Sequence, residues 1–358
     1  MVQGEVRSGR SRAKTDDEGG HDVVVVGLGP VAAGVAAWLS EHGSDPVRML
    51  DHVPSEAGAA ALAGTRAVVF VAHSGNLAET LAVPAGRRRT DAVADAERLL
   101  AAARTARVGH VVAVSSAMVL GARPGQGPLG DDAPLVDPVD GLGDGAVGDL
   151  LAVEAVLARA ARRRGGPRVA VLRPAPLVGP GIDTLVTRHF EAPRLLTVRG
   201  TEREWQLLHV DDLGAAVGVV LDHGLRGPLT VGSTDVLTAR EVEVAAGMRR
   251  IELAAVTAFG TAERLHRVGV LPAPASELAY TVYPWTVTSS ALLAAGWVPR
   301  WPAAACLDVL LEGVQGRTAL GGRRVGARDA AALGAAGAAV AAIGTAAVWR
   351  QARARRRR

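Results

Sequence analysis

The sequence predicts an α/β protein built on a doubly wound parallel sheet, and three features lead to this fold class. The run VVVV at residues 23–26 is β-branched and uncharged, which is typical of a strand buried on both faces of a parallel sheet. Similar strands then alternate with Ala/Leu-rich helical segments, which implies right-handed crossovers. A glycine loop, GLGP, joins the first strand to the first helix. Together they indicate a Rossmann-type sheet.

The predicted elements follow one another along the first half of the chain. Strands are expected at 23–26, 47–50, 67–72, 110–114 and 168–172, and helices at 31–41, 55–63, 90–105 and 149–162. Residues 121–148 are rich in Gly, Pro and Asp and have no hydrophobic period, so they are expected to form a mobile loop. In such sheets ligands bind at the carboxyl ends of the strands, and functional residues are expected there.

Changes in composition divide the chain into segments. A polar leader at 1–20 has no apolar stretch of the kind found in secretory signals and is expected to be disordered. The divisions that follow are a dinucleotide-binding domain at 21–180 to which 205–220 return, a smaller substrate-type domain at 181–316, a basic linker at 317–329, a hydrophobic helix at 330–349 and a basic tail at 350–358.

Composition excludes several classes of function. The chain has 40 Lys+Arg against 36 Asp+Glu, and a net charge of +4 provides no general attraction to nucleic acid. Its single cysteine, Cys306, excludes an intramolecular disulfide and any multi-cysteine metal site, and no other metal site is predicted. Cys306 is expected to be a small buried hydrophobe. One cysteine also fits a reducing, cytoplasmic compartment.

The glycine loop has the spacing of a dinucleotide-binding turn. Gly27, Gly29 and Ala32 form G-x-G-x-x-A directly after a strand and at the start of a helix. Gly27 would make the tight turn, Gly29 would let the backbone approach a pyrophosphate, and Ala32 would allow close packing of helix on strand. The N-terminus of the helix would then attract the phosphates.

An acidic residue follows the next strand at the spacing that such sites use. Asp51 lies 24 residues after Gly27, where a carboxylate would bind the 2′-hydroxyl of the adenine ribose and repel a 2′-phosphate. NAD is therefore the expected cofactor, although Arg48 and His52 leave NADP open. Asp51 could instead be a turn residue or a helix cap.

Four further segments carry a family resemblance. They are VVFVAHS at 68–74, VVAVSSAMVLG at 111–121, VLRPAPLVGPG at 171–181 and LLHVDDLGAAV at 207–217, and they occur in this order. With them the chain resembles the NAD-dependent epimerase/dehydratase group of extended short-chain dehydrogenases/reductases. Residues 283–301 also resemble the C-terminal end of actinobacterial members of this group.

The resemblance implies roles for individual positions. Ala72 and His73, with Val71, would lie beside the riboses of the cofactor, and Ser116 would take the place of the catalytic Ser/Thr. The residues implied to line the nicotinamide are Pro174, Ala175 and Leu177. For His209 and Asp212 we favour structural roles, a buried hydrogen bond and a helix N-cap.

The family's Tyr-x-x-x-Lys pair is missing. Lys14, in the leader, is the one lysine, and Tyr280 and Tyr283 are the only tyrosines, so the inventory excludes the pair. The resemblance puts Ala146 at the place of the tyrosine and Leu150 at that of the lysine. Neither side chain can transfer a proton, and the standard acid–base chemistry should lose orders of magnitude in rate.

Substitute groups are available near the expected nicotinamide. His73 has a suitable ordinary pKa for an acid or base, and Ser116 can donate a hydrogen bond; His73 could equally be a solvent-facing loop histidine. Asp144 and Asp149 flank the lost tyrosine's place and are expected to be solvated. The sequence thus predicts weak or altered oxidoreductase or epimerase activity on a small or nucleotide-linked substrate, or a non-catalytic NAD-binding regulatory or scaffold protein.

Residues 330–349 form a stretch of twenty uncharged residues, enough for about 30 Å of helix, with arginines on both sides. This pattern predicts a membrane-associated helix on a cytoplasmic protein, with orientation left open. Ala and Gly insert weakly, so the helix could instead pack against another protomer. The resemblance also implies a possible homodimer formed through helices 90–105 and 149–162.

Overall fold

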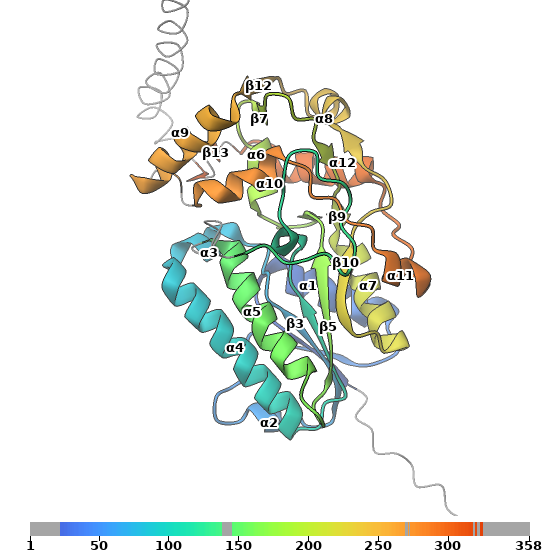
Figure 1. Cartoon of the computed structure of the whole chain (residues 1–358). Coiled ribbons are helices and arrows are strands. Elements are labelled where there is room, and N and C mark those ends of the chain that lie inside the picture. Colours follow the sequence, from blue (N-terminus) through green and yellow to red (C-terminus); the bar gives the residue numbers. More distant parts are fainter. Residues whose placement is uncertain are drawn as a thin grey trace, which may run out of the picture.

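The computed structural model describes residues 22–137, 145–268, 271, 273–317, 319–320 and 323–324. Its centre is a six-stranded, all-parallel sheet in the order β10-β5-β4-β3-β1-β2 (Figure 1). The strands are β1 (Asp22–Val26), β2 (Val47–Leu50), β3 (Thr65–Val71), β4 (His110–Val114), β5 (Arg168–Pro174) and β10 (Gly227–Val231). Numbered by position along the chain, this order is 6-5-4-3-1-2, in which the strand order reverses beside β1, as in doubly wound sheets. The doubly wound parallel sheet that the sequence predicts is confirmed.

The alternation of side chains along β1 explains why helices cover both faces. Val23 and Val25 join the core that includes α1 (Gly29–His42) and α7 (Val210–His223). Val24 and Val26 join a second core with α4 (Ala85–Thr105) and α5 (Ala146–Ala161). Because successive residues of a strand point to opposite faces, an unbroken run of valines supplies apolar surface to both layers.

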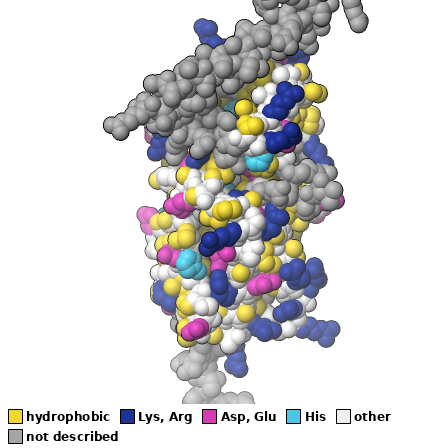
Figure 2. Space-filling view, turned by 90° about the vertical axis from the view of Figure 1, so that its left-hand side faces the viewer, with side chains coloured by type: hydrophobic (Ala, Val, Ile, Leu, Met, Phe, Trp, Pro, Cys, Tyr) yellow, Lys and Arg dark blue, Asp and Glu magenta, His cyan; other side chains and the backbone are white. Residues whose placement is uncertain are grey.

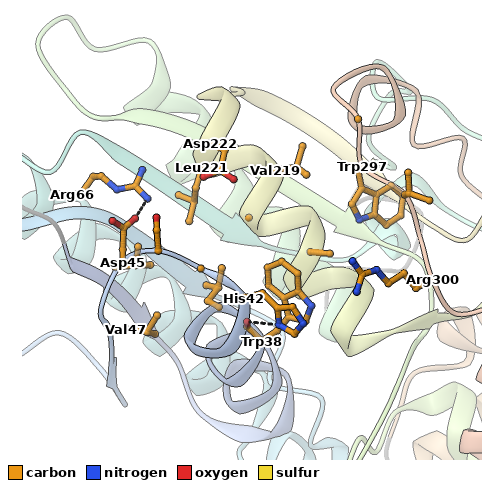
Figure 3. Close-up of a pocket in the computed structure, with 18 residues that line it drawn as sticks. Trp38, His42, Asp45, Val47, Arg66, Val219, Leu221, Asp222, Trp297 and Arg300 are labelled. Carbon is orange, nitrogen blue, oxygen red and sulfur yellow. Dashed lines mark hydrogen bonds and ion pairs between the residues drawn. The ribbon is translucent and has the colours of Figure 1, made fainter.

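Glycines allow α7 to lie unusually close to α1. A Cβ on Gly214 would come within 2.5 Å of the Trp38 Cβ, and one on Gly218 within 3.0 Å of the Trp38 ring. Likewise, a Cβ on Gly34 of α1 would meet Val210 at 2.5 Å. Figure 3 shows Trp38 beside α7.

The remaining elements lie mainly above the carboxyl ends of the strands (Figure 1). Four pairs of short strands are β6 (Leu177–Val178) with β9 (Leu208–His209), β7 (Leu195–Val198) with β12 (Arg250–Leu253), β8 (Glu204–Trp205) with β11 (Leu237–Thr238), and β13 (Ala319–Leu320) with β14 (Arg323–Arg324). The other α-helices are α2 (Gly58–Ala61), α3 (Leu77–Ala82), α6 (Leu185–Phe190), α8 (Ala239–Ala246), α9 (Ala255–Arg267), α10 (Ala279–Val282), α11 (Ser290–Ala294) and α12 (Ala303–Val314); 3₁₀ turns are η1 (Ala117–Leu120) and η3 (Ala275–Leu278).

Several predicted bounds differ from the structure. The strands at 47–50 and 110–114 are confirmed, whereas the helix predicted at 55–63 is helical only at 58–61. Helix α4 begins five residues before the predicted 90–105, directly after Pro84, which fixes a φ suited to the first turn. Beyond the predicted return at 205–220, β10 adds a sixth strand beside β5.

The segment at 121–148 is predicted to be a mobile loop, and the part that the structure describes is hydrogen-bonded to distant elements. The carboxylate of Asp131 accepts the backbone N–H groups of Thr230 at 2.6 Å and Ala291 at 3.1 Å. Its last residues belong to α5, which begins at Ala146. Absence of a hydrophobic period did not reveal these contacts because they join residues far apart in the sequence.

Exposed arginines gather where α4 and α5 end: Arg104, Arg107, Arg162, Arg163 and Arg164. Figure 2 shows dark blue side chains toward the lower end of one face of the molecule. Cations near helix C-termini interact favourably with the helix dipole. Cys306 is fully buried in α12, as predicted.

The predicted hydrophobic helix at 330–349 lies outside the described residues, as do the leader at 1–20 and the tail at 350–358. Within the described ranges, no helix has both the length and the apolar character that crossing a bilayer requires.

The contact between α1 and α7 gives a stability prediction. Gly214→Ala should lower the free energy of unfolding by about 1–3 kcal/mol, since the added methyl group would overlap the rigid Cβ of Trp38. The matched control is Gly260→Ala in α9, where an added Cβ meets nothing within 4 Å and the helix should gain up to about 1 kcal/mol. Urea unfolding of both variants measures the difference; equal effects would contradict the packing argument.

Candidate active site

A cavity of about 300 Å³ opens at the carboxyl ends of β1, β2 and β3. This volume lies within the range of small-ligand sites, about 300–1,000 Å³. Its walls come from the glycine loop, from the ends of β2 and β3, and from α4 and α5. The site therefore lies at the edge of the sheet where ligands bind in doubly wound folds.

The glycine loop approaches β3 so closely that side chains cannot be accommodated. Gly27 has φ +148°, and a Cβ there would lie 3.0 Å from the Val71 carbonyl oxygen. Gly29 has φ +86°, and its Cβ would lie 2.7 Å from the carbonyl oxygen of Ser74. Ala32 is fully buried in the core beside β1. Gly29 therefore comes close to the protein backbone at Ser74. The sequence predicted a close approach to a pyrophosphate and gave no sign of this second constraint.

Two N–H groups of this loop are available to a ligand. The Val31 N–H donates to the Ser74 carbonyl at 3.2 Å, and Pro30 has no N–H. The N–H groups of Leu28 and Gly29 have no backbone acceptor among the described residues. The beginning of α1 thus offers two adjacent donors and the positive end of a helix dipole, a combination that binds phosphate.

Asp51 and Arg48, which the sequence left as competing indicators, lie in different places. Asp51 and His52 line the cavity just after β2. The Arg48 guanidinium points toward the opposite end of the strands, where it pairs with Asp22 at 3.1 Å and donates to the Thr65 hydroxyl at 3.2 Å. Arg48 does not line the cavity, so its side chain is not placed to contact a ligand bound beside Asp51.

A second, much smaller cavity of about 50 Å³ adjoins the first. His73, Ala146 and Thr80 line both. The predicted residues brought together around the small cavity are His73, Ser116, Pro174, Ala175 and Leu177. Gly27, Asp51, Ala72 and His73 line the large one. These predicted residues thus form one continuous region, whereas Gly29 and Ala32 line neither cavity. The chemical roles of all of them remain predictions.

Ser116 is fixed by a local turn and by a buried network beside it. It precedes η1, and its hydroxyl oxygen accepts the Met118 N–H at 3.2 Å. The neighbouring Ser115 donates its hydroxyl to Glu154 at 2.6 Å, and the same carboxylate binds the Arg173 guanidinium at 2.8 Å. Serine, glutamate and arginine come from β4's end, α5 and β5, so three elements hold the position of Ser116.

His73 lies at the junction of the two cavities. Burial lowers its pKa from the ordinary value to about 4. The imidazole is therefore neutral at pH 7, which corrects the sequence argument from an ordinary histidine pKa. A neutral imidazole can accept a proton or donate one hydrogen bond, but it does not serve as a cationic acid.

Tyr280 is a residue of the small cavity that the sequence argument did not assign. It is buried, and its hydroxyl donates to the Met118 carbonyl at 2.7 Å. Burial, followed by the charge of Glu277, raises its pKa far above the ordinary value. A tyrosine so held fills space and binds backbone, and it is unsuited to proton transfer near neutral pH. The one feature of the sequence that could have drawn attention to Tyr280 is that the chain has only two tyrosines.

Glu277 was also missed. Its side chain is 3% exposed and accepts the N–H groups of Ala146 and Val147, the latter at 3.4 Å. It therefore caps α5 from a segment 130 residues away, and a Cβ on Gly145 would lie only 2.0 Å from its oxygen. Burial raises the pKa of this carboxyl. Capping by a distant residue explains why α5 starts earlier than local signals indicated.

His209 and Asp212 have structural contacts, with the two expected roles exchanged. His209 is the N-cap of α7 and accepts the Asp211 N–H at 3.2 Å, while its ring stacks on Trp301 at 3.8 Å. Asp212 accepts the N–H groups of Arg300 at 2.8 Å and Trp301 at 3.0 Å.

Comparison with known proteins assigns the family. Residues 18–232, more than half of the chain, match the model of the NAD dependent epimerase/dehydratase family. The chain belongs to this family. NAD is the cofactor named in the family's description.

Solved structures of the epimerase/dehydratase type share this fold. A crystal structure of gox2253 matches with a TM-score of 0.61 and 20% identity, covering 82% of this chain and 97% of that one. MoeE5 in complex with UDP-glucuronic acid and NAD gives 0.59 and 19%, covering 82% and 99%. The Thermus thermophilus UDP-glucose 4-epimerase complex with NAD gives 0.56 and 18%, covering 82% and 99%. At these identities the likeness concerns the fold.

The curated relatives are uncharacterized proteins. Rv0501 of Mycobacterium tuberculosis and Mb0513 of Mycobacterium bovis are each 25% identical over 168 residues. The match spans 46% of this chain and 44% of each relative, less than half the length of either.

Helix α5 carries two of the positions that the family resemblance singles out. Ala146 lies where the two cavities meet, and Leu150, one turn further, lines the large cavity and is 4% exposed. The resemblance puts the family's tyrosine and lysine at these two positions. Asp149, which was expected to be solvated, is instead 7% exposed on the same helix, while Asp144 lies outside the described residues.

A larger cavity, about 490 Å³, lies away from this site. Val23, Val47 and Arg66 line it, so it is at the amino ends of β1, β2 and β3 (Figure 3). Arg66 there pairs with Asp45. None of the predicted site residues lines it.

The cap on α5 leads to a prediction about stability and pH. Since burial raises the pKa of Glu277, the folded protein binds this proton more tightly than the unfolded chain does. The stability contribution is present below the unfolded pKa and is lost as the pH rises through the folded one. Glu277→Gln cannot ionise, so its stability relative to wild type should improve between pH 4 and 8 in urea unfolding.

Glu241→Gln is the control with the opposite sign. Hydrogen bonds from Thr238 lower the pKa of Glu241, so the wild type gains from ionisation as the pH rises and the variant should lose relative stability. Identical pH profiles for both variants would contradict the assignment for Glu277.

Proposed function

We propose that this chain binds NAD in the 300 Å³ cavity and has weak or altered oxidoreductase or epimerase activity on a small or nucleotide-linked substrate. The observation that carries the proposal is the continuity of two cavities. One is lined by Gly27 and Asp51, and the other by Ser116 and the segment after β5; His73 and Ala146 lie between them. Bound NAD would supply a hydride acceptor or donor.

The residues present fit this cofactor. The free N–H groups of Leu28 and Gly29 suit the pyrophosphate, and the Asp51 carboxylate suits the hydroxyls of the adenine ribose. At the far end, Pro174, Ala175 and Leu177 form an apolar wall suited to a nicotinamide ring. The large cavity therefore suits the adenine ribose and pyrophosphate of NAD, and its junction with the small cavity suits the nicotinamide.

In this proposal, acid–base catalysis is weaker than in the family's standard mechanism. Ala146 and Leu150 cannot take part, and Tyr280 donates to backbone. His73, neutral at pH 7, could accept a substrate proton, but only as a weak base because its pKa is about 4. The Ser116 hydroxyl could donate a hydrogen bond to a substrate oxygen. Positioning of substrate against cofactor would then provide most of any rate enhancement.

The second candidate is a non-catalytic, NAD-binding regulatory or scaffold protein. The small volume of the substrate-side cavity, about 50 Å³ and lined by large side chains such as Tyr280, Trp285 and Leu185, favours it. Membrane attachment through 330–349 and homodimer formation through α4 and α5 remain predictions that belong to either candidate.

Calorimetric titration with NAD and NADP tests cofactor binding. Asp51→Asn should weaken NAD binding about 10- to 100-fold, as expected for loss of a charged hydrogen-bond acceptor, and should reduce the preference over NADP. Asp222→Asn, on the opposite side of the sheet, should leave both affinities unchanged. Absence of binding to either nucleotide at millimolar concentration would overturn the proposal.

Redox turnover of bound NAD separates the two candidates. With an active enzyme, His73→Ala should lower turnover of a substrate about 100-fold or more while NAD affinity changes little. The measurements are NADH absorbance with a panel of sugar nucleotides and small alcohols, and chromatography of the sugar nucleotides for epimer formation, since an epimerase regenerates its NAD. Turnover that is undetectable for the wild type, with NAD bound, would support the scaffold alternative.

A further inference from the structure

One face of α5 forms a wall of the cofactor cavity. Ala146, Asp149, Leu150 and Val153 are spaced by three and four residues, so they share a face, and all four line the 300 Å³ cavity. Asp149 is the polar member of this set, and its side chain is 10% exposed. A carboxylate thus lies one turn from Ala146, at the end of the cavity that meets the small one.

Two arginines of α4 hold this carboxylate in place. Arg88 forms an ion pair with Asp149, and its guanidinium also donates to the carbonyls of Thr80 and Val83 at 3.4 Å. The Arg89 guanidinium lies 3.3 Å from the other oxygen of Asp149. Since a carboxylate can accept about four hydrogen bonds, these contacts hold Asp149 in place without using all of its acceptor capacity, and Asp149 also lines the cavity.

The charges around the cavity indicate which part of a ligand meets Asp149. Asp51, Asp91, Asp95 and Asp149 all line it, and Arg88 is the lining arginine, already bound to Asp149. Asp91 pairs with Arg87 and Asp95 with Arg98, so the charge of this wall is partly compensated. The N–H groups of the glycine loop, at the positive end of a helix dipole, are the more favourable place for phosphate groups. Neutral hydroxyls, which donate to carboxylates, suit the wall.

We propose that Asp149 is a positioning residue that accepts hydrogen bonds from the hydroxyls of the nicotinamide ribose. It would act at the opposite end of the cavity from Asp51, and from the position next to Leu150, where the family's lysine is missing. This inference rests on the proposed binding of NAD. It makes the cofactor's two riboses the ligands of two carboxylates, one after β2 and one on α5.

The direction in which NAD affinity changes when the charge of Asp149 is removed tests the proposal. Asp149→Asn should weaken NAD binding about 10- to 100-fold, because a carboxylate acceptor of the ribose hydroxyls is lost. Asp222→Asn removes the same charge outside this cavity and should leave NAD affinity unchanged. An affinity that is also unchanged or tighter for Asp149→Asn would show that Asp149 has no ribose contact, which would overturn the proposal.

Half-molecules of the cofactor locate the effect. For Asp149→Asn, the affinity for nicotinamide mononucleotide should fall by the same factor as for NAD, while the affinity for AMP stays unchanged. Equal losses for both halves, together with a lowered melting temperature, would assign Asp149 a purely structural role and overturn the inference. Failure of the wild type to bind NAD would instead overturn the proposed function itself, so the two failures are distinguishable.

Discussion

The buried ion pair between Glu154 and Arg173 is the constraint on which the geometry of the site depends. Their side chains are 4% and 7% exposed, and Ser115 donates to the same carboxylate. Burying two charges is unfavourable unless the geometry and hydrogen bonding are good, and removing one partner costs about 3–5 kcal/mol. Because the partners lie on α5 and β5, the pair fixes where the helix meets the strand, and with it the distance from Ala146 to Ser116.

Helix α5 is therefore a shared wall rather than a simple covering of the sheet. Its apolar residues pack on the sheet, Glu154 anchors it below the site, and Glu277 caps its first turn from the region above. Asp149 faces the cavity and is held from α4. The residues of α5 that could position a cofactor or substrate are held in place by these contacts. The two positions that the resemblance gives to the family's proton-transfer pair, Ala146 and Leu150, lie on the same helix.

The proposed function separates cofactor binding from proton transfer. In that proposal NAD would be held by backbone N–H groups, glycines and carboxylates, none of which depends on the tyrosine and lysine that the family resemblance implies. Proton transfer depends on a group of suitable pKa, and the titratable side chains lining the small cavity include a histidine with a pKa of about 4 and a tyrosine with a pKa far above neutral. Binding and chemistry can thus be lost separately in this fold, which is why the two proposed functions differ only in turnover.

Much of the fold was predictable because its signals are local. The valine run, the glycine spacing and the strands at 47–50 and 110–114 follow from periodicity and from the steric limits on residues other than glycine. The inventory alone excluded a Tyr–Lys pair. What only the tertiary structure decided are contacts between distant segments: Glu277 capping α5, Tyr280 closing the small cavity, Arg48 turned away from Asp51, and burial lowering the pKa of His73. Sequence spacing carries no information on these, because they depend on desolvation, on partners more than a hundred residues away or, for Arg48, on side chains at the starts of β1 and β3.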